Sequence, residues 1–182
     1  MTALPDYLLI AVDDWHTHRP DAPRAIINLP SVEAPATPGF MYSVGIHPWN
    51  AADATPELIG ALCKRAADPA VVAIGEGGLD RMRGPGLEVQ LPVFEAQARI
   101  ADEVGKPLIV HAVRTIPEII SMHKKLRPEM PWIIHGFRGG PEAARQLIAH
   151  PGLYISVGSR FRHDAVAVVP PSRLLHETDD DY

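Results

Sequence analysis

Short runs of apolar residues recur along the chain, and each run ends at Gly, Pro or a polar residue. Eight of these runs have the length and composition of a buried β-strand; they lie at residues 8–12, 25–29, 42–46, 71–74, 108–110, 132–134, 153–157 and 173–175. Several are separated by longer segments with the apolar spacing of an amphipathic helix, at residues 55–67, 88–104, 115–126 and 141–149. Strands that alternate with helices predict a parallel sheet covered by helices.

Eight strands of this kind predict an α/β fold in the form of a compact (β/α)8 barrel, similar to a TIM barrel. The chain has 182 residues, which is fewer than such barrels usually need. Residues 19–24 and 30–41 are short and contain prolines, so we expect the early crossovers to be loops without helices. We expect no final helix after the eighth strand, and a single domain over residues 1–182.

The charge balance limits the kind of partner that the protein can bind. Acidic residues outnumber basic ones by 22 to 17, so the net charge of -5 disfavours nonspecific binding along duplex nucleic acid. An anionic substrate would need a local positive centre. No apolar run has the length of a membrane-spanning helix and no signal peptide is visible, so we expect a cytoplasmic protein without membrane association. The lone Cys63 lies in a helix-like segment, where we expect it to pack as a small apolar residue.

Polar residues of the types that bind metal ions follow six of the predicted strands. Asp14, His16 and His18 follow the first strand, His47 the third, Glu76 the fourth, His111 the fifth, His135 the sixth and Asp179 the eighth. The carboxyl ends of barrel strands meet at one mouth, so we expect these side chains to converge there. Imidazole and carboxylate suit Zn²⁺, Mn²⁺ or Fe²⁺, whereas Mg²⁺ prefers carboxylates. The pattern predicts a metal cluster.

Each of these signals also has an ordinary interpretation when it is taken alone. His16-Thr17-His18 is a pair of alternate residues that can bind one ion, or simply a polar strand end. Glu76 lies in a Gly-rich segment that allows close approach, or forms a solvated turn. His111 and His135 leave fully apolar strands, so each imidazole needs a hydrogen bond or an ion.

The acid cluster at the end of the chain has two interpretations. We interpret Asp179 as a metal ligand or general base, and Asp180 and Asp181 as part of an acidic chain end.

Six motifs together resemble those of the TatD-like metal-dependent hydrolases, often called TatD-type DNases. They are Asp14-Trp-His-Thr-His18, Val44-Gly-Ile-His-Pro48, Ala73-Ile-Gly-Glu-Gly-Gly-Leu-Asp80, Pro107-Leu-Ile-Val-His111, Ile134-His-Gly-Phe137 and Leu174-Leu-His-Glu-Thr-Asp179. Their order, their spacing and their placement after strands agree with the family over almost the whole chain. The resemblance implies a barrel hydrolase with one or two divalent cations and, in several members, phosphodiesterase activity on DNA.

The resemblance also implies roles for individual residues. His16, His18 and Asp179 resemble ligands of the first metal, Glu76 the bridging carboxylate, and His111 and His135 the ligands of the second; His47 resembles a residue of the substrate cavity and Asp80 a residue that supports the site. Arg114 and Arg138 are the candidate anion-binding groups. Three features differ from the family: Glu76-Gly-Gly-Leu-Asp80 replaces the usual form with Ile between the glycines, Arg114 lies farther from His111 than in many members, and relatives continue into a final helix.

These implications lead to one functional hypothesis and two alternatives. The hypothesis is hydrolysis of a phosphodiester by water activated at a di-metal site of Zn, Mg or Mn, with Asp179 and Glu76 as catalytic residues. Aromatic residues are only 6% of the chain, so we expect the substrate to be the end of a DNA strand or a small molecule. The alternatives are hydrolysis of another ester, a lactone or an amide, and a non-catalytic metal-binding relative. No obligate protein partner is expected.

Overall fold

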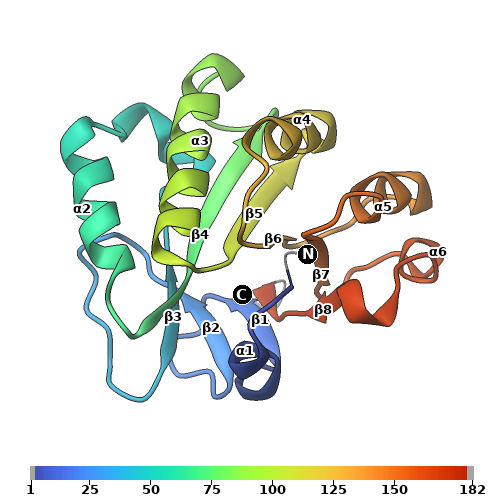
Figure 1. Cartoon of the computed structure of the whole chain (residues 1–182), viewed down its shortest axis with the longest axis horizontal. Helices are drawn as coiled ribbons and strands as arrows, with labels where there is room; N and C mark the ends of the chain where they lie inside the picture. Colours follow the sequence, from blue (N-terminus) through green and yellow to red (C-terminus); the bar gives the residue numbers. More distant parts are fainter. Residues whose placement is uncertain (1–2, 180–182) are drawn as a thin grey trace.

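A computed structural model describes residues 3–179, and its eight strands form one parallel sheet. The strands are β1 (Asp14–Thr17), β2 (Ala25–Asn28), β3 (Met41–Val44), β4 (Val71–Asp80), β5 (Leu108–Val113), β6 (Trp132–Ile134), β7 (Leu153–Val157) and β8 (Leu174–His176). Each strand pairs with the next one along the chain, and β8 returns to contact β1 (Figure 1). The strands form a nearly closed barrel, which confirms the predicted fold.

Helices cover the outside of the barrel (Figure 1). They are α1 (Asp6–Ala11), α2 (Pro56–Ala66), α3 (Leu87–Val104), α4 (Ile116–Leu126), α5 (Pro141–Ile148) and α6 (His163–Val166), with two 3₁₀ helices, η1 (Pro48–Asp53) and η2 (Pro171–Arg173). The four predicted helices are confirmed as α2 to α5, and the connections 18–24 and 29–40 contain no helix, as expected. No helix in residues 3–179 is long and apolar enough to cross a membrane.

The predicted strand at residues 8–12 is wrong, because this segment forms most of α1 and the first strand begins at Asp14. A short apolar run does not by itself distinguish a strand from one face of a buried helix. Here Leu8 is fully buried while Ile10 is 74% exposed, as expected when only one side of a helix faces the core. The predictions for Asp180 and Asp181, and for the absence of a final helix, lie outside the described residues.

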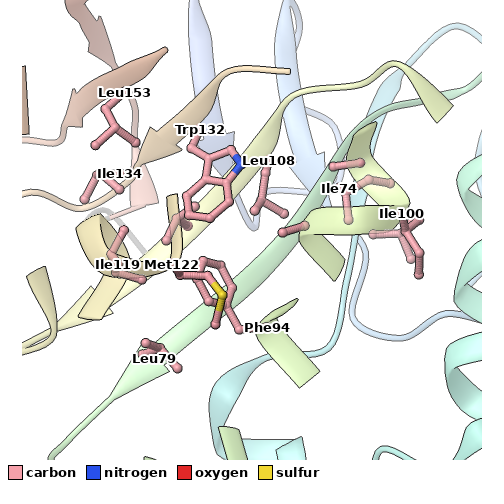
Figure 2. Packing of buried hydrophobic residues seen from close by; sticks show 14 of the residues in the cluster. Ile74, Leu79, Phe94, Ile100, Leu108, Ile119, Met122, Trp132, Ile134 and Leu153 are labelled. Carbon is pink, nitrogen blue, oxygen red and sulfur yellow. The ribbon is translucent and has the colours of Figure 1, made fainter. Parts of the chain in front are cut away.

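The larger apolar core lies between the strands and the helices. Figure 2 shows part of it, where Phe94 of α3 and Met122 of α4 lie near Trp132 of β6. The rings of Phe94 and Trp132 are 5.1 Å apart and nearly perpendicular, a favourable arrangement for two aromatic side chains. Burial of the outward-facing residues of the strands in this way attaches the helices to the barrel wall.

The second apolar core fills one end of the barrel interior, and we call it the lower layer. It consists of Leu4, Leu8, Val12, Trp15, Ile26, Val72, Ala73, Ile109, Ile133, Tyr154 and Leu175. In neighbouring strands, Ile109 is paired with Ile133, and Ile133 is paired with Tyr154. The backbone N–H of Leu4 donates a hydrogen bond to the hydroxyl of Tyr154 at 3.3 Å. Because α1 and the residues around it close this end of the barrel, a functional site in the interior has to lie at the opposite end.

Candidate metal centre

Polar side chains lie above the lower layer, at the carboxyl ends of the strands. Side chains two residues apart on a strand point to the same face, so His111 follows Ile109 into the barrel interior and His135 follows Ile133. Glu76 enters from β4, which is buried along its whole length and continues to Asp80, beyond the predicted end at Ile74. The converging side chains meet around the Glu76 carboxylate, which is 5% exposed.

Close packing on both sides of β4 fixes the position of Glu76. Gly75 and Gly78 have φ angles of +123° and +142°, and a Cβ atom at either position would collide with the backbone of β5. The backbone N–H of Glu76 donates a hydrogen bond to the side chain of Asn28 at 2.9 Å. The Gly-rich segment is therefore part of a strand that holds a buried carboxylate, and the alternative of a solvated turn is wrong.

The first group of donor atoms contains His16, His18, Asp179 and the Oε2 atom of Glu76. Asp179 Oδ1 lies 3.4 Å from His16 Nε2 and 3.3 Å from His18 Nε2. Glu76 Oε2 lies 3.4 Å and 3.8 Å from the same two nitrogen atoms. The four atoms thus surround a common point on one side of Glu76.

The second group surrounds the other carboxylate oxygen of Glu76. Glu76 Oε1 lies 2.7 Å from His111 Nδ1, 2.8 Å from His135 Nε2 and 3.1 Å from His47 Nε2. The structure therefore brings together the six predicted metal ligands and His47; Asp14, which was also expected at the mouth, is not among them. It also places His47 in contact with Glu76 itself, deeper in the site than a residue that only lines the cavity.

Asp80 lies behind His111 and fixes its orientation. Its Oδ2 atom is 3.0 Å from His111 Nε2 and accepts a hydrogen bond of 2.7 Å from the indole N–H of Trp49. Its Oδ1 atom accepts hydrogen bonds from the backbone N–H groups of Met82 and Arg83. Burial raises the pKa of Asp80, but these hydrogen bonds lower it by more, so the pKa lies below its ordinary value. Asp80 is thus a charged acceptor that holds His111 with Nδ1 toward Glu76.

Glu177 has the corresponding position behind His135, and it is not among the site residues predicted from the sequence. Its buried carboxylate accepts a hydrogen bond of 2.5 Å from the backbone N–H of Gly136, and its Oε1 atom lies 3.7 Å from His135 Nδ1. The signal in the sequence was the alternation in an extended segment, which places Glu177 and Asp179 on the same side.

Thr178, between these two acids, points the other way and binds Asp14. The Thr178 hydroxyl donates a hydrogen bond of 2.6 Å to Asp14 Oδ2, and its backbone N–H donates one of 3.1 Å to Asp14 Oδ1. These contacts join the segment after β8 to β1. Asp14 therefore closes the barrel and does not face the donor groups.

The charges at the centre are strongly coupled. Burial alone raises the pKa of Glu76, but the positive charge on His135 and the hydrogen bonds of His111, His135 and His16 lower it to well below its usual range. For His135, burial lowers the pKa, and the charge of Glu76 together with hydrogen bonding to Glu177 raises it to well above its usual range. The centre therefore keeps its carboxylates ionised and requires positive charge around them.

A bound divalent cation explains the arrangement of the donor atoms better than hydrogen bonds among the side chains do. Both ring nitrogens of the fully buried His16, and Nδ1 of His135, make no hydrogen bond of good geometry: the carboxylate oxygens beside His16 Nε2 lie 3.4 Å away, and Glu177 Oε1 lies 3.7 Å from His135 Nδ1. Unpaired buried polar atoms are costly and need an explanation. Three sets of residues have ligand atoms within 4.8 Å of one another: His16 with His135 and Asp179, His16 with His18 and Glu76, and His47 with Glu76 and His111. Imidazole and carboxylate donors in this arrangement are typical of a divalent metal site.

A large groove, which we call the basic groove, opens from the second group of donors. It has a volume of about 1020 Å³, and its lining includes the side chains of Trp49, Arg83, Arg114, Arg138 and Arg160. The two predicted arginines, Arg114 and Arg138, both lie there, and the structure adds Arg83 and Arg160. A smaller cavity of about 250 Å³ on the other side of Glu76 is lined by Asn28, Glu33, Asp53 and other residues without a positive charge. The positive charge at the mouth is therefore concentrated on one side.

Comparisons with known proteins agree with this geometry. An uncharacterized metal-dependent hydrolase, YabD of Bacillus subtilis strain 168, is 34% identical over 151 residues, which are 77% of this chain and 58% of YabD. The 3'-5' ssDNA/RNA exonuclease TatD of Pantoea vagans is 32% identical over 161 residues, which are 82% of this chain and 61% of that protein. The chain thus spans about three fifths of the length of these curated relatives.

The fold and a family model point to the same assignment. The crystal structure of YjjV, a TatD homolog from Escherichia coli, superposes with a TM-score of 0.79 at 22% identity and covers 94% of this chain and 80% of YjjV. The model of the family described as TatD related DNase matches residues 28–182. The chain therefore belongs to the TatD related DNase family.

Proposed function

We propose that the protein hydrolyses phosphodiester bonds with the help of divalent cations held around Glu76. The observation that supports this proposal best is the position of the donor groups, in which imidazoles and carboxylates from six strands converge beside a groove that contains four arginines. Relatives named as exonucleases of single-stranded DNA and RNA support a nucleic-acid substrate, and we propose DNA.

The two groups of donors suggest how cations are held. His16, His18 and Asp179 would hold one ion with Glu76 Oε2, and His111 and His135 would hold another with Glu76 Oε1. This excess of imidazole over carboxylate favours Zn²⁺ or Mn²⁺ over Mg²⁺. When bound, such a pair of ions lowers the pKa of water and stabilises charge on the attacking and leaving oxygens of a phosphodiester.

Asp179 is the carboxylate of the centre that can reach an attacking water. Its side chain is 22% exposed and lies at the inner end of the basic groove, whereas Glu76 is almost fully buried. Hydrogen bonds from His16 and His18 overcome the effect of burial and hold the pKa of Asp179 well below its usual range. The ionised carboxylate therefore accepts a hydrogen bond from the water and orients it. Because a carboxylate with so low a pKa is a weak base, we favour orientation of the water over lasting transfer of its proton to Asp179.

Arg114 and Arg138 hold the phosphate in this proposal. Both line the basic groove next to His111 and His135. A guanidinium group matches the oxygen atoms of a phosphate with two parallel hydrogen bonds, and it provides the local positive charge that a chain with a net charge of -5 needs. A neutral ester, lactone or amide would make no use of these arginines, which is why we favour the phosphodiester.

The test is release of nucleotides from end-labelled single-stranded DNA by the purified protein, with Mn²⁺, Zn²⁺, Mg²⁺ or a chelator. We expect release that needs the metal, that is lost in His16→Ala and that persists in His150→Ala. His150 lies at the end of α5, away from the donor groups, and is the matched control. Metal binding without release would support the non-catalytic relative instead. The single domain, the cytoplasmic location and the lack of an obligate protein partner stay predictions.

A further inference from the structure

Trp49 is exposed, yet its indole ring has a fixed position at the wall of the basic groove. It belongs to η1, the 3₁₀ helix that begins directly after His47, and it is 41% exposed. The indole N–H donates to Asp80 at 2.7 Å, and the ring of His47 packs edge-on at a centroid distance of 4.5 Å. An exposed aromatic ring gains little stability from burial, so a ring held by polar contacts is well suited to bind a ligand.

The ring is also close to the centre. Its centroid lies 6.1 Å from that of His111, whose Nδ1 atom contacts Glu76. Arg114 and Arg138 line the same groove, so a single strand bound there would have its phosphate near the arginines and a base near the indole. Sequence-tolerant binding of single strands combines these two features, a cationic groove for the backbone and an aromatic face for the base.

Arg83 provides a second flat group at the same place. Its guanidinium carbon lies 4.8 Å from the centre of the Trp49 ring, and its backbone N–H donates to Asp80. A guanidinium plane stacks on aromatic rings and on bases alike. Trp49 and Arg83 are therefore two planar groups, both attached to Asp80, that border one groove.

We propose that Trp49, with the Arg83 guanidinium over one face of its ring, stacks a nucleobase on its remaining exposed surface, next to the phosphodiester that is cleaved, which makes Trp49 a positioning residue for unpaired nucleic acid. This inference rests on the proposed function. It explains why a protein with few aromatic residues exposes an indole at this position. It also selects against the interior of a duplex, where the faces of each base are covered by the neighbouring base pairs.

The first experiment measures binding without turnover. The other two tryptophans, Trp15 and Trp132, are buried, so an oligonucleotide that stacks on Trp49 should quench the exposed part of the fluorescence. In a Glu76→Gln background we expect single-stranded DNA to quench, and a strand with abasic residues at its 3′ end to quench far less. Trp49→Phe should remove this signal. Equal quenching by the normal and the abasic strand would overturn the proposal.

The second experiment separates stacking from support of Asp80. Trp49→Leu should raise KM for a normal strand by about 10- to 100-fold, the range expected for the loss of one stacked base, with little change in kcat. Trp49→Phe, which keeps the ring and loses the donor to Asp80, should keep most of the affinity. The abasic strand should be insensitive to Trp49→Leu. A loss in kcat of similar size on both strands would show that Trp49 acts only through Asp80 and would overturn the proposal.

A control and a separate outcome make the failures distinguishable. Tyr7 is also exposed, at 55%, but it belongs to α1 and does not line the basic groove, so Tyr7→Ala should leave KM unchanged. Base-dependent quenching without any cleavage would contradict the proposed hydrolysis and still support the stacking site. Cleavage that does not depend on Trp49 would support the proposed hydrolysis and contradict the stacking site.

Discussion

The two ends of the barrel interior are built from the same strands, yet they differ completely in chemistry. On β5 and β6, Ile109 and Ile133 belong to the lower layer, and His111 and His135, two residues farther on, belong to the centre. Both pairs are buried or nearly so. A step of two residues along a strand thus separates side chains that hold the barrel together from side chains that are costly to bury.

This difference indicates which layer contributes stability and which contributes function. Each buried aliphatic side chain of the lower layer contributes roughly 1.5–3 kcal/mol through burial of apolar surface. The centre concentrates ionised carboxylates and imidazoles, and ring nitrogens of two of the imidazoles, His16 and His135, make no hydrogen bond of good geometry. A protein under selection for stability alone would fill this space with apolar residues. Substitutions in the centre should therefore reduce activity with little loss of stability, and substitutions in the lower layer should reduce stability with little loss of activity.

The largest effect should come from Glu76→Gln. The substitution keeps the size of the side chain and removes the charge that both donor groups share, so we expect the rate of DNA cleavage to fall by about 10³-fold, equivalent to roughly 4 kcal/mol. Metal content, measured by mass spectrometry after dialysis, should fall with it, while the free energy of unfolding without metal stays level or rises. Retention of more than a tenth of the activity would contradict the central role of Glu76.

Ile133→Ala should show the opposite behaviour in the lower layer. Removal of this fully buried side chain leaves a cavity in the barrel interior, and we expect the free energy of unfolding to drop by about 3 kcal/mol. Denaturant titration measures this change, and cleavage per folded molecule should remain normal. Ile10→Ala, at a residue that is 74% exposed, should cost less than about 0.5 kcal/mol. A similar loss in both variants would show that the lower layer is not a close-packed core.

A histidine outside the barrel separates the effect of burial from the effect of a carboxylate partner. His123 is 9% exposed and packs against Trp132 with a ring separation of 5.1 Å. Burial and the positive charges of His150 and Arg173 lower the pKa of His123 to about 4, against the opposite influence of Asp102. Burial beside Glu76 leaves the pKa of His135 raised instead.

The lowered pKa of His123 gives stability a defined dependence on pH. Between the ordinary value of 6.5 and about 4, the unfolded chain binds a proton at this residue that the folded chain does not, so this share of stability is lost as the pH falls. From pH 7.5 to pH 5 the loss should be about 2 kcal/mol. Parallel unfolding titrations of the wild type and of His123→Phe should differ by this amount. Identical pH profiles would rule out the effect.

The smallest effect should come from the contact that closes the barrel. Thr178→Val removes the hydroxyl that donates to Asp14, and we expect a loss of about 1 kcal/mol in the free energy of unfolding, as for one typical hydrogen bond. Because Asp179 is the next residue, activity should also fall by a few fold. Thr178→Ser keeps the hydroxyl and should restore most of both quantities. If Thr178→Ser behaves like Thr178→Val, the hydroxyl is not the cause.

The apolar pattern was sufficient to predict seven of the eight strands, because strands covered on both faces are continuous apolar runs. It failed at β1, whose residues Asp14 to Thr17 are partly polar because they build the mouth and the closing contact. The same polar residues made the donor set predictable from sequence. The residues behind the ligands were harder to predict: Glu177 lies beside His135, and Trp49 donates to Asp80, and these contacts between distant parts of the chain appear only in the folded structure.

The closed lower end of the barrel also affects how the chain can fold during synthesis. Leu4 and Leu8 precede all eight strands, but the cluster that they join includes Tyr154 and Leu175, and Tyr154 is synthesised 150 residues after Leu4. Such long-range contacts form slowly and leave apolar surface uncovered in the meantime. During translation the apolar face of α1 therefore stays uncovered until the strands that carry Tyr154 and Leu175 have left the ribosome, and the nascent chain should bind chaperones that recognise exposed apolar segments.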